Sequence, residues 1–403
     1  MCADNTQNQD CVRECGGVAA LVGLLAPGGP AAMQREAAAA LCNLCNSNIS
    51  NQDCVRECGG VAALVGLLTP SHSAAVHEQA AAALWNLCWN NTENKDNIRE
   101  CGGVAALVGL LAPGHSAAVR EQAAGALRNL CANSTENKDS IRECGGVAAL
   151  VGLLAPGTSA AVHEQAAGGL TNLCIDSTQN AVCVRWCGGI AALVGLLAPG
   201  NPAAVRELAA GALRSVCCKD AMNKDYVREC GGVAALVALL APGGSAAVHE
   251  EAAGALRNLC YESAIIDKDC LRKCGGIAAL VALLAPSGSA AMHEYAAGAL
   301  VNLTSDCEPC PEAVRACGGV ATLVALLAPG GLAGVHKQAA GALVHLTSES
   351  EQCREAVRAC GGVAALERVL ACASSAAAHE WVAAALRNLG HDQQGVGESG
   401  QPS

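Results

Sequence analysis

The chain has 403 residues, a formal net charge of −11 and only 2 % aromatic residues, with no phenylalanine. The acidic balance excludes the broad basic surface that nucleic-acid phosphates require, so we expect no nucleic-acid partner and instead a basic or apolar protein or peptide. With so few large rings, the core must be packed from Ala, Val and Leu, of which Ala and Leu are strong helix formers.

A repeat organises the chain. The tripeptide Cys-Gly-Gly occurs nine times, at intervals of 43 residues in every case but one, where the interval is 44. A period of this length indicates one supersecondary unit that is repeated along the chain. Such units must stack because none can bury its apolar face alone. We expect one solenoid over residues 5–390, followed by a disordered Gly-, Gln- and Ser-rich tail at 391–403. The predicted repeats are 5–47, 48–90, 91–133, 134–176, 177–219, 220–263, 264–306, 307–349 and 350–390.

The third repeat carries the clearest signals for the individual elements. Residues 94–101 predict a short first helix stopped by Gly102-Gly103, and residues 104–111 predict a second helix that ends before Pro113-Gly114. The second helix is apolar throughout, so we expect it to lie inside, between the other two. Ser116 is the predicted N-cap of a third helix over residues 117–132. The buried stripe predicted on that helix consists of Val119, Ala123, Ala126, Leu127 and Leu130.

The residues of the repeat resemble those of a known family. In the third repeat the resemblance rests on Asn94-Lys95, Ile98, Gly102-Gly103-Val104, Leu107-Val108, Leu110-Leu111, Glu121, Ala123-Ala124 and Ala126-Leu127-Arg128-Asn129-Leu130. This pattern resembles the armadillo repeat, and it is most similar to the arrays of plant-type U-box ligases and vacuolar scaffolds. The resemblance implies an all-α, right-handed superhelix of nine three-helix repeats, whose third helices line a groove that binds extended peptides.

An asparagine near the end of the third helix recurs in seven repeats. In armadillo proteins the matching asparagine hydrogen-bonds the backbone of a bound peptide, and an amide suits this role because it both donates and accepts. The alternative is that these asparagines tie neighbouring repeats together. Four residues earlier, where nuclear-import adaptors carry Trp, this chain has only Ala or Gly, so we do not expect a classical import-signal groove. The ladder consists of Asn43, Asn86, Asn129, Asn172, Asn258, Asn302 and Asn388, with Ser215 and His345 interrupting it.

Scarce aromatic residues and several arginines fall near this ladder. On a helical wheel Trp89, Tyr261, Tyr295 and Trp381 face the same way as the asparagines, and Trp85 lies on the flank. Aromatic side chains are good binding anchors, although they also fill gaps between helices of small residues. One residue before the asparagine stand Arg128, Arg214 and Arg257, and eight residues before it most repeats carry Glu. These charges partly neutralise one another, and the remaining glutamates favour a basic partner.

Cysteine and histidine also recur at fixed positions, and neither pattern predicts a metal or cofactor. The cysteines before Gly-Gly, and those near the end of the third helix, are interpreted as reduced and buried small residues, because later repeats replace the latter by Thr304, Thr347 and Gly390. The recurring histidines alternate with Arg120 and Arg206, so we expect surface histidines rather than ligands. The spacing of Cys307 and Cys310 is typical of redox or zinc motifs, but no second ligand pair accompanies it.

The combined features predict a non-catalytic scaffold or adaptor that holds an extended peptide or helix of a partner. The alternatives are the substrate-recognition component of a ubiquitin ligase and a membrane-attached scaffold. The first residues do not resemble a secretion signal and the apolar runs are broken by Pro-Gly, so we expect a cytoplasmic or nuclear protein that is not secreted and has no transmembrane segment. The first repeat has no obvious polar cap, so we expect either that its face at residues 12–25 self-associates or that the native gene is longer.

Overall fold

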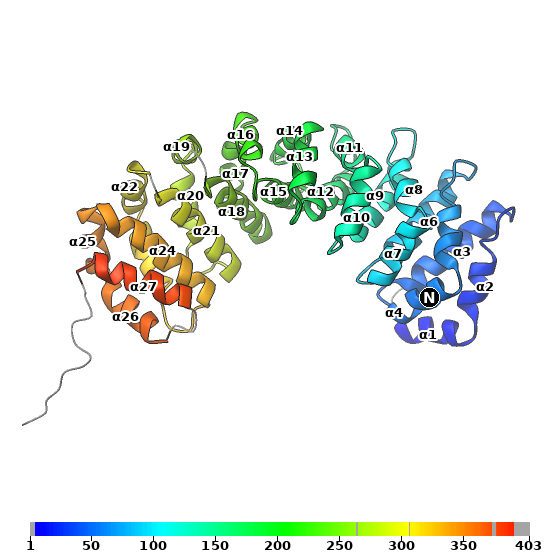
Figure 1. The fold of residues 1–403 in the computed structure, drawn as a ribbon, viewed down its shortest axis with the longest axis horizontal. Coiled ribbons are helices and arrows are strands. Elements are labelled where there is room, and N and C mark those ends of the chain that lie inside the picture. Colours follow the sequence, from blue (N-terminus) through cyan, green and yellow to red (C-terminus); the bar gives the residue numbers. More distant parts are fainter. Residues whose placement is uncertain (1–4, 263–264, 306, 373–375, 391–403) are drawn as a thin grey trace, which may run out of the picture. The chain divides into compact units, whose positions relative to one another are not determined.

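The computed structural model describes residues 5–262, 265–305, 307–372 and 376–390, and the predicted tail at 391–403 lies outside them. The described residues form 27 helices and no strand. The chain divides into two compact units, Met1–Tyr226 and Val227–Ser403, and each is described by itself (Figure 1). Each unit is a stack of consecutive helices, which confirms the predicted all-α solenoid.

Three helices recur in each repeat. The first helices are α1 (Thr6–Glu14), α4 (Ile49–Glu57), α7 (Thr92–Glu100), α10 (Thr135–Glu143), α13 (Thr178–Trp186), α16 (Ala221–Glu229), α19 (Ile265–Lys273), α22 (Pro309–Ala316) and α25 (Glu351–Ala359). The second helices are α2 (Gly17–Gly23), α5 (Gly60–Gly66), α8 (Gly103–Gly109), α11 (Gly146–Gly152), α14 (Gly189–Leu196), α17 (Gly232–Leu239), α20 (Gly276–Leu283), α23 (Gly319–Ala325) and α26 (Gly362–Cys372). The third helices are α3 (Ala31–Cys45), α6 (Ala74–Leu87), α9 (Ala117–Cys131), α12 (Ala160–Cys174), α15 (Ala203–Val216), α18 (Ala246–Cys260), α21 (Ala290–Thr304), α24 (Ala333–Glu349) and α27 (Ala376–Asn388).

Local chemistry explains where the helices begin and end. The side chain of Asn91 accepts a hydrogen bond from the Asn94 N–H at 3.1 Å, so the first helix of repeat three begins two residues before the predicted start. Gly102 ends that helix in the left-handed conformation, with φ of +76°. Gly103 is needed for a different reason, because a Cβ there would lie 2.6 Å from the Cγ2 atom of Ile98. The predicted N-cap Ser116 accepts from the Val119 N–H at 3.2 Å.

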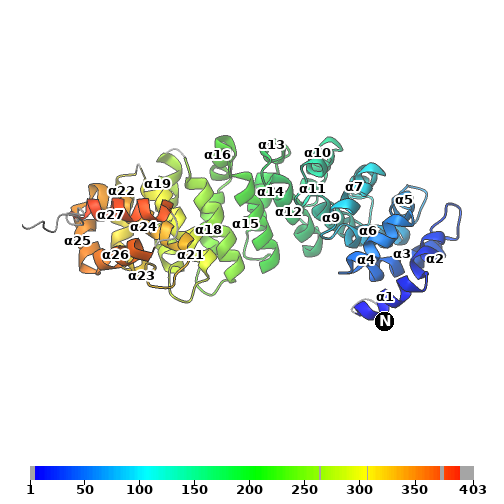
Figure 2. The same cartoon turned by 60° about the horizontal axis from the view of Figure 1, so that its bottom comes forward.

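The third helices form the core of each unit. In unit 1, α3, α6, α9, α12 and α15 pack one after another, and in unit 2 the same holds for α18, α21, α24 and α27 (Figure 2). The stripe predicted on α9, from Val119 to Leu130, is fully buried. The prediction that the second helix lies inside is wrong, because Ala105 and Gly109 of α8 are exposed. The exposed edge of the second helix consists of small residues such as Ala and Gly, which is why its sequence is apolar throughout.

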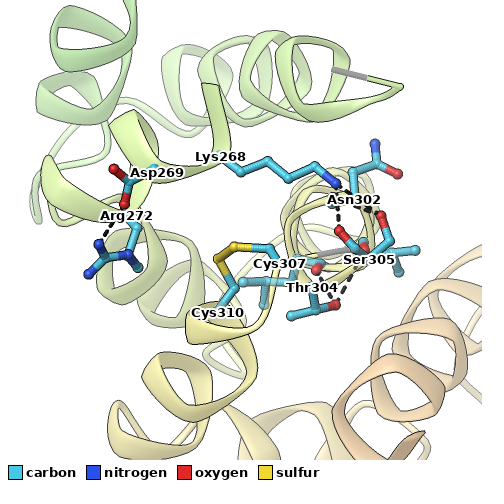
Figure 3. The surroundings of a disulfide bond; sticks show 10 residues. Lys268, Asp269, Arg272, Asn302, Thr304, Ser305, Cys307 and Cys310 are labelled. Atoms are coloured by element: carbon cyan, nitrogen blue, oxygen red, sulfur yellow. Dashed lines mark hydrogen bonds and ion pairs between the residues drawn. A yellow bond between two sulfur atoms is a disulfide. The ribbon is translucent and has the colours of Figure 1, made fainter. Parts of the chain in front are cut away.

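Polar side chains tie each repeat to the next. Arg56 forms an ion pair with Asp53 at 2.8 Å, as the recurring spacing of acid and arginine suggests, and it also donates to Asn94 of the next repeat at 3.0 Å. Within a repeat, buried lysines of the first helix cap the C-terminus of the third helix: Lys138 donates to the carbonyl of Ile175 at 2.6 Å, and Lys268 donates to that of Ser305 at 2.5 Å (Figure 3). These contacts satisfy carbonyls that the helix leaves unpaired at its C-terminus.

Candidate functional site

The ladder asparagines lie in the C-terminal halves of the third helices, and Trp89 and Tyr261 lie just beyond the ends of α6 and α18. Tyr295 and Trp381 lie in the N-terminal halves of α21 and α27. Asn43 is exposed, Asn129 is buried, and the other five asparagines of the ladder are half-buried. The ladder is therefore at the edge of the helix stack, where side chains have both a protein neighbour and access to solvent.

The amide nitrogens of the ladder bind the preceding repeat. Asn86 donates to the carbonyl of Cys42 at 2.9 Å, and Asn129 donates to that of Trp85 at 3.2 Å. The same contact recurs from Asn172 to Arg128, from Asn302 to Arg257 and from Asn388 to Val344. The alternative prediction, that the asparagines tie repeats together, is thus realised in the structure. The amide oxygens of Asn86 and Asn129 receive no hydrogen bond from the described residues, so each side chain keeps an acceptor.

A hollow in unit 1 brings several predicted residues together. It has a volume of about 260 Å³. Trp89 is 52 % exposed, and Trp85 is half-buried beside it. Two indole rings and two ladder amides therefore share one concave surface. The lining residues are Asn46, Ser47, Trp85, Asn86, Trp89 and Asn129.

Glycines of the third helix make room for large side chains of the preceding repeat. A Cβ at Gly125 would lie 2.6 Å from ring carbons of Trp85, and one at Gly168 would lie 2.6 Å from the guanidinium of Arg128. In unit 2 a Cβ at Gly298 would similarly meet Arg257 at 2.8 Å. These glycines occupy the position where import adaptors carry Trp. At these three positions the side chain of the residue before the ladder asparagine packs against the next third helix.

The predicted anchors of unit 2 differ in accessibility. Tyr261 is 50 % exposed, and a hydrogen bond from its hydroxyl to the Glu262 carboxylate raises the pKa of the tyrosine. Tyr295 is half-buried. Trp381 is also half-buried, and its ring lies 5.7 Å from that of His345, the residue that replaces asparagine in repeat eight. Among these three, Tyr261 offers the most surface to a partner.

The charged side chains of the third helices are largely engaged within the solenoid. Arg128 donates to Gln165 of the next repeat at 3.2 Å. Glu250 accepts a hydrogen bond from Ser289, the N-cap of α21, where a negative charge is favourable. The carboxylate of Glu294 lies against Gly334 at the start of α24. The recurring glutamate thus contacts the N-terminus of the following third helix at these two positions.

The comparisons with known proteins decide the family. The family model described as Armadillo/beta-catenin-like repeat matches residues 5–46, 48–89, 91–132, 134–175, 220–261 and 267–305. The chain belongs to the armadillo-repeat family. Crystal structures of two engineered proteins from the Northeast Structural Genomics Consortium are similar to it. One has a TM-score of 0.88 at 32 % identity and covers 96 % of this chain and 92 % of its own; the other has a TM-score of 0.57 at 29 % identity and covers 61 % and 96 %. No curated protein matches.

Armadillo solenoids generally bind proteins and are typically non-catalytic. Within the described residues, no helix combines the length and apolar character that crossing a bilayer requires. The same residues contain no group of three or more potential metal ligands among His, Cys, Asp and Glu.

In this armadillo chain the prediction of surface histidines is wrong for His77, His163 and His249, whereas His379 is exposed. His77 and His163 are buried, at 4 % and 6 % exposure, and His249 is buried too. The Nε2 of His77 lies 2.9 Å from the carbonyl oxygen of Thr69, which can only accept, so Nε2 carries the proton. The ring thereby holds the loop between the second and third helices. Gln34 makes the same contact to Ala26 in the first repeat, at 3.0 Å.

The cysteines divide into two classes. Those near the end of the third helix, such as Cys88 and Cys131, are buried as predicted. Those before Gly-Gly are exposed or half-exposed, so the prediction of burial is wrong for them: they follow the last turn of the first helix at the surface. Cys307 and Cys310, whose spacing is typical of redox or zinc motifs, form a disulfide at the start of α22 (Figure 3).

Two aromatic residues lie away from the groove, on first helices. Trp186 is 80 % exposed on α13, and Tyr226 lies on α16. Trp186 is therefore a suitable reference for the groove residue Trp89, because both rings are exposed in the same unit.

Proposed function

We propose that this armadillo chain is a non-catalytic scaffold whose third helices hold an extended peptide or a helix of a partner protein. The observation that carries the proposal is the hollow formed by Trp85, Asn86, Trp89 and Asn129 in unit 1. Exposed indole faces bind apolar side chains or the stems of long basic ones. The adjacent amide oxygens accept hydrogen bonds from peptide N–H groups, a combination that an extended chain satisfies at successive residues.

The charge of the chain favours a basic or apolar partner. The net charge is −11, and a positively charged segment is attracted to such a protein over distances set by ionic strength. The contacts of Glu250 and Arg128 within the stack leave the selection of the partner mainly to the aromatic residues and the amide oxygens.

The experiment is a quantitative pull-down from extracts of the source cells with three forms of the protein. The wild type is compared with a groove variant, Trp89→Ala with Tyr261→Ala, and with the reference variant Trp186→Ala. We expect specific partners to be lost from the groove variant and retained by the reference variant. Equal recovery from all three forms would refute binding in the groove. Co-purification of ubiquitin-conjugating enzymes would instead support the ligase alternative, and enrichment in washed membranes the membrane-attached one.

We also propose self-association through the first repeat. Leu24 is 42 % exposed and Met33 is 45 % exposed, whereas the matching Leu67 and Val76 of repeat two are 2 % and 1 % exposed. These side chains occupy core positions of the repeat, and in the first repeat they remain accessible to a second copy. Sedimentation velocity tests this. We expect concentration-dependent association that Leu24→Glu with Met33→Glu abolishes, and a monomer at every concentration would disprove it.

A further inference from the structure

Four first helices carry a pair of cysteines separated by one helical turn. The pairs are Cys11 and Cys15, Cys54 and Cys58, Cys183 and Cys187, and Cys270 and Cys274. In each pair the backbone N–H of the second cysteine donates to the carbonyl of the first, at 3.1, 3.0, 3.0 and 3.0 Å respectively. The turn is therefore closed, and residues four apart in a helix place their side chains on the same face, with Cβ atoms about 5–6 Å apart.

The thiols of these pairs are accessible from solvent. Cys11, Cys15 and Cys58 are exposed, and the remaining members are half-exposed. The glycine that follows each second cysteine is in the left-handed conformation, and at Gly16, Gly59, Gly188 and Gly275 no atom lies within 4 Å of the place a Cβ would occupy. The backbone next to each second cysteine therefore borders open space on that side.

Within three of the pairs the thiols interact with each other. The pKa of Cys11 is raised mainly by charge repulsion from Cys15 and by a hydrogen bond to it. Burial is the largest cause of the raised pKa of Cys54, followed by the interaction with Cys58, and the same order holds for Cys183 with Cys187. The raised pKa values of these three first cysteines favour their protonated thiols. The two thiols of a pair are close enough to act on one ligand atom.

The fold does not require the first cysteine of the pair. The position of Cys54 is occupied by Asn97 in repeat three, Ser140 in repeat four and Ala313 in repeat eight. The backbone there is the same, since the N–H groups of Cys101 and Cys144 donate to Asn97 and Ser140 at 3.0 Å. The repeats with a single cysteine are thus internal controls for those with two.

We propose that the four cysteine pairs are dithiol sites for a thiophilic trivalent metalloid, represented by an organic arsenical. With phenylarsine oxide, two As–S bonds form and two S–H bonds break, and the arsenic-bound oxygen leaves with both protons as water. Arsenic stays trivalent, and no oxidant or base is consumed. A single thiol forms one such bond and lacks the chelate ring that makes the adduct persist.

The test counts phenylarsine adducts on the native protein by intact mass spectrometry after removal of free reagent. One variant removes the first cysteine of every pair, with Cys11→Ser, Cys54→Ser, Cys183→Ser and Cys270→Ser. The matched control removes four unpaired cysteines, with Cys101→Ser, Cys144→Ser, Cys317→Ser and Cys360→Ser. We expect four fewer adducts on the first variant and no loss on the control. Single substitutions then assign each site: a pair whose disruption removes one adduct is a site, and an unchanged count overturns the assignment for that pair.

Discussion

The packing of Trp85 on Gly125 predicts whether Gly125→Ala raises or lowers stability. A glycine inside a helix costs about 1 kcal/mol relative to alanine, so Gly125→Ala should stabilise α9 if nothing opposed it. The new methyl carbon would, however, lie 2.6 Å from ring carbons of Trp85. Overpacking of this kind costs about 1–3 kcal/mol. We therefore expect a net destabilisation of about 0–2 kcal/mol in the wild-type background.

Removing the Trp85 ring should reverse the sign of this stability change. In a Trp85→Ala background, Gly125→Ala should stabilise by about 1 kcal/mol, which gives a coupling energy between the two sites of about 1–3 kcal/mol. Gly109 provides the control, because a Cβ there has no atom within 4 Å and Ala238, Ala282 and Ala325 occupy the same place in later repeats. Gly109→Ala should be neutral or stabilising in both backgrounds.

Stability is best measured locally, because stacked repeats need not unfold together. Hydrogen exchange of the α9 amides, read by mass spectrometry, reports the opening free energy of that helix in all four forms of the cycle. If Gly125→Ala slows exchange equally with and without the Trp85 ring, the ring does not occupy the site, and the proposed orientation of the groove residues is refuted.

Three further predictions concern groups buried in the stack. Lys138→Met leaves the Ile175 carbonyl without its ammonium donor and should cost about 1–3 kcal/mol in urea unfolding, whereas Lys219→Met, on an exposed lysine, should change little. His77→Ala should cost about 1–3 kcal/mol, while His77→Gln should retain most of the stability, since Gln34 makes the equivalent contact; equal losses would contradict this role. Burial raises the pKa of Cys88 and Cys131 to about 12, above the ordinary 9.0, so the folded state favours the protonated thiols. Their contribution to stability is complete below pH 9 and is lost as the pH rises toward 12; a Cys88→Ala, Cys131→Ala variant should show a shallower decline.

The sequence was sufficient to predict the fold because the same local signals recur from repeat to repeat. Gly-Gly ends the first helix in copy after copy, and a serine such as Ser116 caps the third, so one prediction is tested many times within one chain. The apolar second helix was misassigned for a physical reason. An exposed face made of Ala and Gly has the same composition as a buried one, and only the neighbouring helices determine which it is.

The contacts between the buried histidines and loop carbonyls were not predicted, although the sequence contains a signal for them. Gln34, His77, Arg120 and His163 share one repeat position, and their common property is a side-chain N–H donor. Substitution by arginine argued against a metal, but the shared donor also predicted a recurring acceptor within the same repeat. That acceptor is the backbone carbonyl eight residues earlier. Its position depends on the conformation of the loop between the second and third helices, which helical periodicity does not predict.

The sizes of side chains in neighbouring repeats were a second signal, in this case for the packing between third helices. The large residues Trp85 and Arg128 are each followed forty positions later by glycine, and the small Cys42 and Val344 by alanine, although Thr171 and Val301 also precede glycine. The matching is explained by the side chain of one third helix lying over the next. Recognising it in the sequence requires knowing that this offset joins neighbouring surfaces.

The double role of the asparagines determines which substitutions can test binding. The Nδ2 of Asn86 is bonded to the preceding repeat and its Oδ1 is left for a ligand, so an asparagine substitution weakens the stack and the candidate site together. A loss of binding in such a variant would not distinguish recognition from folding. Trp89 lies just beyond the end of α6 with half its surface exposed, so its removal changes the hollow with little effect on the stack. A partner lost on Trp89→Ala, with unchanged exchange of the α6 and α9 amides, would therefore locate recognition at the hollow itself.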